Sequence, residues 1–470
     1  MIKKLIRKLV GCSDYDIVKE QLDYYYTLSH YDNLTGLANR LHFNEESEKM
    51  LKRCAEETEP LTVFLIDLDN FKMINDSHGH QAGNVLLQEI AHRLISVAKA
   101  RNLLAKSLGR ITHCGAFIVA RLGGDEFVML FEHMDKHEAE LMGRQITQEL
   151  KEPLALDTVE VSVSASVGGS IFPWDGESIH DLLKSADLAM YAAKEDGKDR
   201  FKFHEKSMNT KVERRVELET IIRNIVATEQ VTLVFQPIVE VASRKIVGAE
   251  TLLRGKDALQ KPINPQELIE IAEQSNLIID IGNLIIRRAF EFAQTYLGAA
   301  MHDREIHIAV NISAQQLKDR HFVSDVKDML EQTQLNPTRV VFEITETALV
   351  KNFAESAKAL EDLKELGINI SIDDFGKGYS SFNYLQQLPF DKLKIDSSFV
   401  EPIGSNHPKA NEVIRGIIMM ADGLDMNVCA EGVETEEQLA KLREYGCEHA
   451  QGYYFYKPLS PDDFVDVLME

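Results

Sequence analysis

The sequence predicts an α/β protein of two domains, the second of which is a (β/α)8-like barrel. A chain of 470 residues, 44% of them hydrophobic, is too long for one core and can fill two. In the second half, eight short apolar runs predict strands that end in polar residues, mostly with helical segments between them. In the first half, apolar strands also lead to carboxylates, and one carboxylate pair lies on a predicted hairpin.

Charge and cysteine content exclude several classes of protein. With 52 Lys and Arg against 75 Asp and Glu, the formal net charge is −23, which argues against non-specific binding of a nucleic-acid polymer. The five cysteines are scattered and form no CxxC pair, which indicates a reducing compartment and no structural zinc. No apolar run is long enough to span a membrane. We therefore expect a cytoplasmic protein.

The first segment, residues 1–29, is expected to be a lead-in helix. Its start, MIKKLIRKLV, is basic and amphipathic but too interrupted for a secretory signal. It could rest peripherally on an anionic membrane surface, although we favour a frayed helix. Further on, an apolar stripe at helical spacing could pair with a second copy of the chain or, as we favour, pack on its own domain. The stripe consists of Val18, Leu22, Tyr25 and Tyr26.

The first domain, residues 30–204, presents carboxylates on two separate segments. The apolar run 61–66 ends in Asp67, and Asp125 and Glu126 follow two glycines between β-like runs, which predicts a hairpin. Glycines leave the backbone bare at a turn, so a bulky ligand can approach it. Each feature alone is as well explained by a structural turn. Their combination indicates a two-metal site for phosphoryl transfer.

Four motifs in this domain occur in a specific order: DNLTGLANR at 32–40, DLDNFKMIND at 67–76, GGDEF at 123–127 and ADLAMYAAKEDGK at 186–198. With these motifs, the domain resembles the GGDEF family of diguanylate cyclases. The resemblance implies a palm-like α+β fold with a central antiparallel sheet, which joins two GTP molecules into cyclic di-GMP across a homodimer. It also implies site residues: Asp67, the Leu68 carbonyl and Asp125 for Mg²⁺, Glu126 for catalysis, and Phe71, Lys72, Asn75, Asn84, Lys194 and Lys198 for the nucleotide.

Three departures from the GGDEF pattern bear on whether this domain synthesises cyclic di-GMP. Asn84 stands where a second guanine-reading Asp is usual, and it can accept a hydrogen bond but lacks the charge. The product-inhibition motif RxxD is replaced at 114–117, so inhibition at that site is expected to be absent. The long interval before the hairpin implies an insertion around 98–113, whose basic part could extend a helix or form a partner surface. GTP binding is therefore expected, and GTP turnover is left open.

Residues 205–230 predict a charged, amphipathic connecting helix, followed by the second domain, residues 231–470. A single buried Glu or Asn in a strand could be a satisfied core group. Eight polar residues at successive strand ends instead predict chemistry on the C-terminal rim of a barrel. The strands are expected to end at Gln236, Glu250, Asn311, Glu343, Asp373, Lys394, Glu431 and Gln451.

Asp373 and Asp374 are adjacent at one of these strand ends, before a glycine-rich loop. Two neighbouring carboxylates repel each other unless a cation neutralises them, so this pair predicts a divalent metal with oxygen ligands. A solvated turn is the alternative.

The second domain resembles the EAL family of cyclic di-GMP phosphodiesterases over about residues 212–470. The segments that carry this resemblance are FQPI, ETLLR, NIS, EITE, DDFGKGYSS, KLKID, AEGVET and QGYYFYKPL. It implies hydrolysis of cyclic di-GMP to linear pGpG with two Mg²⁺ or Mn²⁺ ions. The resemblance implies that one metal is held by Glu250, Asn311, Glu343 and Asp373, and the second by Asp373 and Asp374. Lys394 would orient the attacking water, Glu431 would act as general base, and Gln451 would complete the shell. Gln236 and Arg254 would contact the dinucleotide, while Glu346 and Asp396 would support the loop after Asp373.

Two departures from the EAL pattern are mild. Thr251 replaces the middle residue of the namesake triplet, and Lys377 replaces a usual threonine and adds a cation beside the metal loop. We expect a bacterial cyclic di-GMP phosphodiesterase whose first domain binds GTP and is regulatory or also synthesises. The alternatives are a net or bifunctional diguanylate cyclase and a catalytically silent nucleotide receptor.

Overall fold

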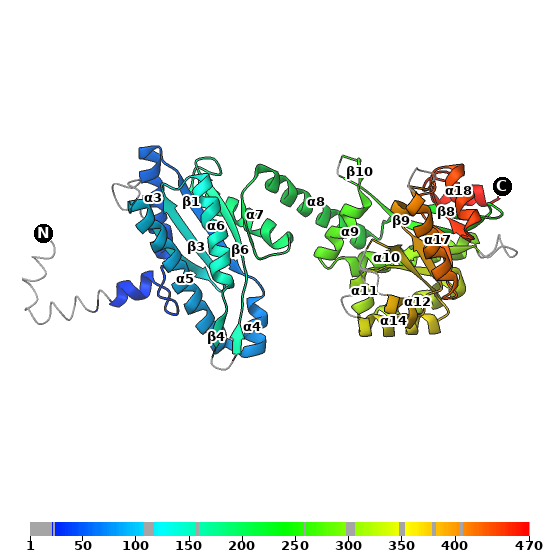
Figure 1. The fold of residues 1–470 in the computed structure, drawn as a ribbon, viewed down its shortest axis with the longest axis horizontal. Coiled ribbons are helices and arrows are strands. Elements are labelled where there is room, and N and C mark those ends of the chain that lie inside the picture. The colour runs from blue at the N-terminus through cyan, green and yellow to red at the C-terminus, as the bar shows by residue number, and fades with distance from the viewer. Residues whose placement is uncertain are drawn as a thin grey trace, which may run out of the picture. The chain divides into compact units, whose positions relative to one another are not determined.

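The structure is a computed structural model of the chain that describes residues 21, 24–107, 117–156, 159–257, 259–297, 306–346, 353–377, 382–403 and 408–469. Most of the predicted lead-in helix, residues 108–113 of the predicted insertion and residues 114–116 therefore lie outside the described residues. The chain forms two compact units, Met1–Glu213 and Arg214–Glu470 (Figure 1). None of the described helices is both long and apolar enough to cross a membrane.

A five-stranded sheet in the order β2-β3-β1-β6-β7 forms the centre of the first unit. Its middle strand, β1, has the sequence LTVFLIDL and is buried along almost its whole length, because helices cover both faces of the sheet. β1 runs antiparallel to β3 and β6, as the palm-like prediction requires, while the outer pair β6–β7 is parallel. The strands are β1 Leu61–Leu68, β2 Phe117–Gly123, β3 Glu126–Glu132, β6 Ala165–Phe172 and β7 Arg200–Phe203, beside a small ladder of β4 Leu154–Leu156 and β5 Val159–Val161.

Alternate side chains of β1 point to opposite faces of the sheet and divide the core of this unit in two. Phe64 and Ile66 belong to the cluster with α5 (His80–Ser107) and α6 (Lys136–Lys151). Val63 and Leu65 belong to the cluster with α3 (Arg40–Glu57) and α7 (Ile179–Glu195). The short helix α4 spans Phe71–His78. α5 continues to Ser107, so part of the predicted insertion extends this helix.

The second unit contains eight strands that close into a barrel, which confirms the predicted barrel fold. Its order is β9-β11-β12-β13-β14-β15-β16-β8, and β8 also pairs with β9. Neighbouring strands are parallel except that β8 runs antiparallel to both β9 and β16. The strands are β8 Thr232–Glu240, β9 Ile246–Lys256, β11 His307–Asn311, β12 Val340–Thr345, β13 Asn369–Phe375, β14 Lys392–Ile395, β15 Asn427–Ala430 and β16 His449–Ala450.

The antiparallel start of the barrel corrects the prediction that every strand ends at its polar residue. Gln236 and Glu250 lie opposite each other in the middle of β8 and β9. The link at 241–245 is too short for a crossover helix, so these strands form a hairpin. Both side chains still share one face of the hairpin, because directly opposed residues of an antiparallel pair point the same way.

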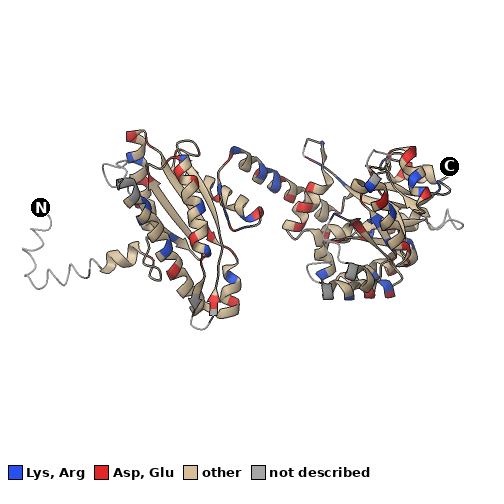
Figure 2. Cartoon of the chain, viewed as in Figure 1, with Lys and Arg blue, Asp and Glu red and all other residues tan. Residues whose placement is uncertain are grey.

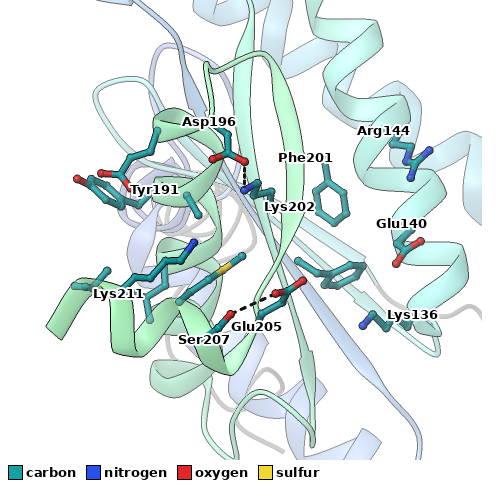
Figure 3. Close-up of a pocket in the computed structure, with 16 residues that line it drawn as sticks. Lys136, Glu140, Arg144, Tyr191, Asp196, Phe201, Lys202, Glu205, Ser207 and Lys211 are labelled. Carbon is teal, nitrogen blue, oxygen red and sulfur yellow. Dashed lines mark hydrogen bonds and ion pairs between the residues drawn. The ribbon is translucent and has the colours of Figure 1, made fainter. Parts of the chain in front are cut away.

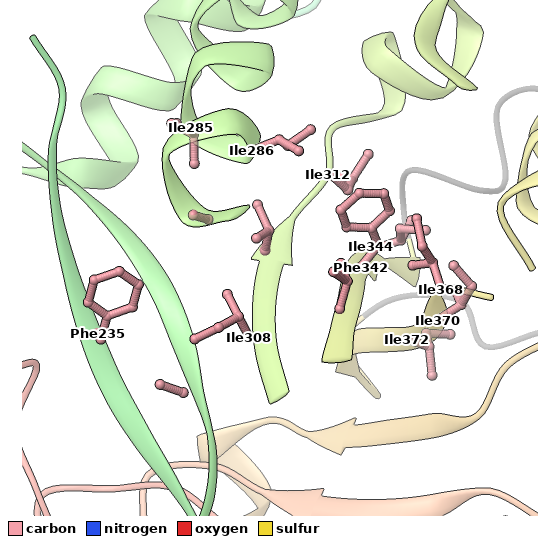
Figure 4. Close-up of a cluster of buried hydrophobic side chains, with 14 of the residues drawn as sticks. Phe235, Ile285, Ile286, Ile308, Ile312, Phe342, Ile344, Ile368, Ile370 and Ile372 are labelled. Carbon is pink, nitrogen blue, oxygen red and sulfur yellow. The ribbon is translucent and has the colours of Figure 1, made fainter. Parts of the chain in front are cut away.

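The main core of the second unit lies between its strands and the surrounding helices. Figure 4 shows Ile285 and Ile286 of α10 (Ile278–Phe292) near β11, and Phe342, Ile344, Ile368, Ile370 and Ile372 gathered around the next strands. In Figure 2 the charged residues of both units lie largely on the helices. The remaining helices are α8 Lys206–Thr228, α9 Pro265–Gln274, α10 Ile278–Phe292, α11 Ala314–Lys318, α12 Phe322–Thr333, α14 Phe353–Glu365, α15 Phe382–Gln387, α16 Ser397–Val400, α17 Pro408–Asp422, α18 Glu436–Glu444 and α19 Pro461–Met469.

His449 in β16 predicts how the barrel responds to acid. Burial, with Lys392 and His307 nearby, lowers the pKa of His449 from 6.5 to about 4. Between these two values the unfolded chain binds a proton that the folded chain does not, so this residue makes stability fall as the pH falls. Between about pH 6.5 and pH 4, we expect the unfolding free energy of the wild type to fall by about 2–3 kcal/mol more than that of the His449→Gln variant. Urea unfolding followed by circular dichroism measures this, and parallel pH curves would contradict it.

Candidate active site

Lys394 lies at the centre of a carboxylate cluster inside the barrel. Its side chain in β14 is 1% exposed, and its Nζ lies 2.7 Å from Glu431 Oε1, 2.9 Å from Glu343 Oε2 and 3.2 Å from Asp373 Oδ1. Glu250 Oε2 is 3.5 Å away. These four acids come from or directly follow four different strands, so the closed barrel brings them together.

Two amide side chains hold the carboxylate of Glu250 in place. Asn311 Nδ2 donates to Glu250 Oε1 at 2.8 Å, and Gln451 Nε2 donates to Oε2 at 2.8 Å. Asn311 ends β11 and Gln451 directly follows β16. The structure thus places the four residues that the sequence assigned to one metal in a single cluster, which also contains Lys394 and Gln451.

The charges in this cluster do not balance. Four carboxylates, all buried except the partly exposed Glu431, face one ammonium, and burial raises the pKa of Glu343 well above its usual value and also raises that of Asp373. Burial raises the pKa of Glu431 to about 7. The pKa of Glu250 is lowered because Lys394, Gln451 and Asn311 outweigh its burial. The four carboxylates in turn raise the pKa of Lys394, which stays charged despite its burial.

This surplus of negative charge fits divalent cations. The donor atoms are carboxylate oxygens together with the amide oxygen of Asn311, whose nitrogen is engaged with Glu250. Hard divalent ions prefer oxygen ligands of this kind. Glu250, Asn311, Glu343 and Asp373 could hold one such ion, and a second group of carboxylates lies beside them.

The second group consists of Asp374, Asp396 and Glu431, whose ligand oxygens lie within 4.8 Å of one another. Asp374 has a left-handed backbone, with φ 55°, at an irregularity in the pairing of β13 with β14. Such a kink redirects a side chain, and here it allows adjacent aspartates to serve different groups. Asp396, assigned from the sequence to loop support, accepts from Ser398 N as the N-cap of α16.

Lys377 occupies the edge of this second group. Its Nζ lies 2.7 Å from Asp374 Oδ1 and 2.8 Å from Asp396 Oδ2. These two bonds raise the pKa of Lys377. Despite its burial, hydrogen bonds from Lys377 and Ser398 lower the pKa of Asp396 to about 2. The sequence identified Lys377 as a departure but could not show which carboxylates it pairs with.

We expect the Lys377→Thr variant to bind its weaker Mn²⁺ ion about fivefold more tightly than the wild type. The ammonium competes with a cation for Asp374 and Asp396, and a half-exposed ion pair of this kind is worth about 1 kcal/mol. Electron paramagnetic resonance of free Mn²⁺ measures this binding without any substrate. Lys441→Thr, which removes an exposed lysine paired with Glu444, is the matched control. Equal affinities in wild type and Lys377→Thr would contradict the prediction.

Two further predicted residues, Gln236 and Arg254, lie on the hairpin face that carries Glu250, and Glu346 follows β12. Arg254 is four residues after Glu250 in β9, and its Nη1 donates to Leu253 O at 2.8 Å. Gln236 Nε2 donates to Tyr456 O at 3.4 Å. Glu346 is buried directly after β12. Their assigned roles stay predictions.

In the first unit, the register of β1 against β3 brings predicted residues together. Asp67 in β1 lies directly opposite Glu126, the first residue of β3. Lys194 Nζ from the end of α7 lies 2.7 Å from Asp67 Oδ1. Burial raises the pKa of Asp67, and nearby Asp125 adds to this shift, while Lys194 opposes it. A cation at Asp67 would therefore relieve repulsion between carboxylates.

The predicted nucleotide residues of the first unit are spread over α4, α5, the end of α7 and the turn that follows it. Phe71 and Lys72 begin α4, and Asn84 is exposed on α5. Asn75 packs so closely on Gly83 that a Cβ there would lie 2.0 Å from its Oδ1, which places Asn75 beside the start of α5. Lys198 donates to Asn70 Oδ1 at 2.8 Å, near the loop after β1.

Two residues that shape this site were missed by the sequence reasoning. Arg121 donates to Gly124 O through Nε at 3.0 Å and Nη2 at 2.7 Å, and it pairs with Asp32 at 3.1 Å, so it fixes the hairpin turn. Buried Asp69 accepts from Ser164, Ser166 and the backbone of Asp199. The motifs contain Asp32 and Asp69, but the spacing of their partners along the chain gives no indication of these contacts.

A cavity of about 360 Å³ lies in the first unit between α6, α7, β7 and the start of α8 (Figure 3). It contains none of the predicted site residues. Its basic side chains, Lys136, Arg144, Lys202 and Lys211, are matched by the acids Glu140, Glu195, Asp196 and Glu205. The lining therefore favours no sign of ligand charge.

Comparison with known proteins identifies both units. Residues 29–200 match the family described as diguanylate cyclase, GGDEF domain, and residues 219–458 match the EAL domain family. The chain is 37% identical to the cyclic di-GMP phosphodiesterase NbdA and 33% identical to the bifunctional diguanylate cyclase/cyclic di-GMP phosphodiesterase MucR, both of Pseudomonas aeruginosa. These alignments cover 97% and 93% of this chain, but only 57% of NbdA and 61% of MucR. The chain thus spans little more than half the length of these curated relatives.

Solved structures of EAL proteins resemble large parts of this chain. A MucR phosphodiesterase in complex with cyclic di-GMP has a TM-score of 0.50 and 32% identity, covering 53% of this chain and 99% of its own. The EAL enzyme Bd1971, bound to cAMP and cyclic di-GMP, has a TM-score of 0.53 and 28% identity, covering 67% of this chain and 92% of its own. With both family matches in sequence, the chain belongs to the tandem GGDEF–EAL family.

Proposed function

We propose that the barrel hydrolyses cyclic di-GMP to linear pGpG with Mg²⁺ or Mn²⁺. The observation that carries this proposal is the cluster around Lys394, in which four carboxylates exceed one buried ammonium and leave oxygen donors for cations. The relatives support the substrate, since NbdA is a cyclic di-GMP phosphodiesterase and the MucR phosphodiesterase was solved with this nucleotide.

Each residue of the cluster has a chemical role in this proposal. Bound metal ions would polarise the phosphodiester and offset the charge that develops on phosphorus. Glu431, whose pKa is raised to about 7 by burial, takes the proton of the attacking water. Lys394, at 2.7 Å from Glu431, orients that carboxylate and the water. Gln236 and Arg254, on the face of the hairpin that carries Glu250, bind the dinucleotide, with Arg254 on a phosphate.

The first domain, in the same proposal, binds GTP with Mg²⁺ at Asp67, the Leu68 carbonyl and Asp125, in a homodimer. It either regulates the barrel or also synthesises cyclic di-GMP. A bifunctional enzyme is the second candidate, because Asp67 and Glu126 lie opposite each other with Lys194 paired to Asp67. MucR, a relative of this chain, is bifunctional.

The test is a chromatographic nucleotide assay with Mg²⁺ or Mn²⁺, run separately with cyclic di-GMP and with GTP. We expect conversion of cyclic di-GMP to pGpG by the wild type and none by Glu250→Ala, which removes the carboxylate that Asn311 and Gln451 orient. Accumulation of cyclic di-GMP from GTP would support the cyclase instead. Binding of both nucleotides without any reaction would overturn both activities in favour of a receptor.

A further inference from the structure

Two histidines and a glutamate meet in the first unit, at the point where the chain enters the GGDEF domain. Residues 24–30 are helical and end at His30, while His42 and Glu45 lie in the first half of α3. One ligand atom from each of these three side chains lies within 4.8 Å of the other two. His30 Nε2 is 3.5 Å from Glu45 Oε2, and the His30 and His42 ring centroids are 5.4 Å apart.

The hydrogen bonds of His30 determine which of its nitrogens is available. Its Nδ1 lies 2.6 Å from Ser29 Oγ and 3.0 Å from the carbonyl oxygen of Tyr26, and Ser29 Oγ itself donates to that carbonyl at 3.0 Å. With the Ser29 proton donated to Tyr26 O, both oxygens near Nδ1 accept, so in this arrangement Nδ1 carries the proton and Nε2 of the neutral ring holds a lone pair. That lone pair is directed toward an acceptor, the carboxylate of Glu45. Two acceptors that face each other need a cation between them, either a proton on His30 or a metal ion.

His42 offers a second imidazole beside this pair. Within the described part of the chain, its Nδ1 is buried and has no hydrogen-bond partner. A buried polar atom without a partner costs free energy, and an ion bound at Nδ1 would remove this cost. The ring is packed on one side by Tyr31, at a centroid distance of 5.2 Å, so its position is defined before any ion binds.

The backbone around the three residues is also fixed. Asn39, the N-cap of α3, accepts from His42 N at 3.0 Å and donates through Nδ2 to Ser29 O at 2.7 Å. Its own backbone N–H donates to His30 O at 2.9 Å. The Tyr26 ring stacks on His30 at 4.0 Å. Asn39 thus links the segment that carries His30 to the helix that carries His42 and Glu45.

We propose that His30, His42 and Glu45 bind one divalent transition-metal ion of the zinc class. Imidazole nitrogens favour Zn²⁺ and similar ions over Mg²⁺, and two histidines with one carboxylate leave a fourth position for water in a tetrahedral site. The carbonyl of Tyr26 orients His30 as such carbonyls do in zinc sites. The sequence-based expectation of no structural zinc rested on the cysteines alone. The ion would fasten the helical segment 24–30 to α3, independently of the barrel chemistry.

Zinc titration of the full-length protein tests this site. After chelator treatment, isothermal titration calorimetry with Zn²⁺ is run in excess Mg²⁺, which occupies the oxygen-donor sites. We expect the Glu45→Gln variant to lose one zinc ion per chain or to bind it at least about tenfold more weakly than the wild type. Co²⁺ gives a second readout, because the visible absorption of a four-coordinate ion should be lost in His30→Gln.

Glu46→Gln is the matched control, since Glu46 is the neighbouring acid on α3 but pairs with Lys49. This variant should bind zinc as the wild type does. Zinc held elsewhere in the protein appears equally in all variants and cancels in the comparison. Glu45 is half-exposed, so Glu45→Gln should fold, and circular dichroism checks this. Identical zinc binding by wild type and Glu45→Gln would overturn the proposal and leave a protonated His30 paired with Glu45.

Discussion

Replacing Lys394 with methionine should abolish measurable hydrolysis of cyclic di-GMP and make the stability of the barrel depend on divalent metal. Methionine fills a similar volume but leaves Glu250, Glu343, Asp373 and Glu431 without the buried ammonium. Removing one partner from a buried ionic cluster costs about 3–5 kcal/mol, because the remaining charges are not compensated. Metal ions bound by the same carboxylates should restore part of this loss.

Thermal unfolding with a chelator and with excess Mg²⁺ measures the effect on stability. The difference in midpoint between the two conditions should be larger for Lys394→Met than for the wild type. Lys392→Met is the matched control, since Lys392 begins the same strand, β14, and the variant should retain hydrolysis. Full activity of Lys394→Met, with a midpoint that does not respond to metal, would show that this lysine is neither the compensating cation nor the positioning residue.

The location of the barrel site was predictable because parallel strands bring their carboxyl ends to one rim. Asn311 ends β11, and Glu431 and Gln451 directly follow β15 and β16, as the sequence indicated. The same rule failed for Gln236 and Glu250, which lie in the middle of an antiparallel hairpin. Alternation and apolar content do not reveal strand direction, so only the short link between these strands could have shown the hairpin.

Contacts that depend on backbone details could not be predicted. Lys377 reaches both Asp374 and Asp396, because the left-handed backbone at Asp374 redirects that side chain. In the first unit, the motifs predicted the hairpin and its acids, but not that Arg121 would hold the turn. The His30, His42 and Glu45 cluster was also missed, since the cysteine count was the basis for excluding zinc. Side-chain partners of this kind depend on rotamers and local turns rather than on sequence period.

Replacing Glu431 with glutamine is expected to lower kcat for cyclic di-GMP by about 10²–10⁴-fold at saturating metal, while binding of the nucleotide changes little. Glutamine keeps an oxygen that can accept from Lys394 but cannot take a proton from water. Steady-state kinetics gives kcat, and calorimetry on the same variant gives nucleotide affinity. Glu434→Gln, an exposed acid three residues further along the same segment, should leave both values unchanged.

The stability of Glu431→Gln distinguishes a catalytic role from a structural one. Because burial raises the pKa of Glu431 to about 7, its ionised form is disfavoured in the folded, metal-free barrel. Removing that charge also reduces the surplus of carboxylates over the single ammonium of Lys394. The metal-free variant should therefore be at least as stable as the wild type, the opposite of Lys394→Met. A Glu431→Gln protein that is inactive and less stable would indicate that Glu431 supports the cluster, and the general base would then have to be sought among the other acids around Lys394.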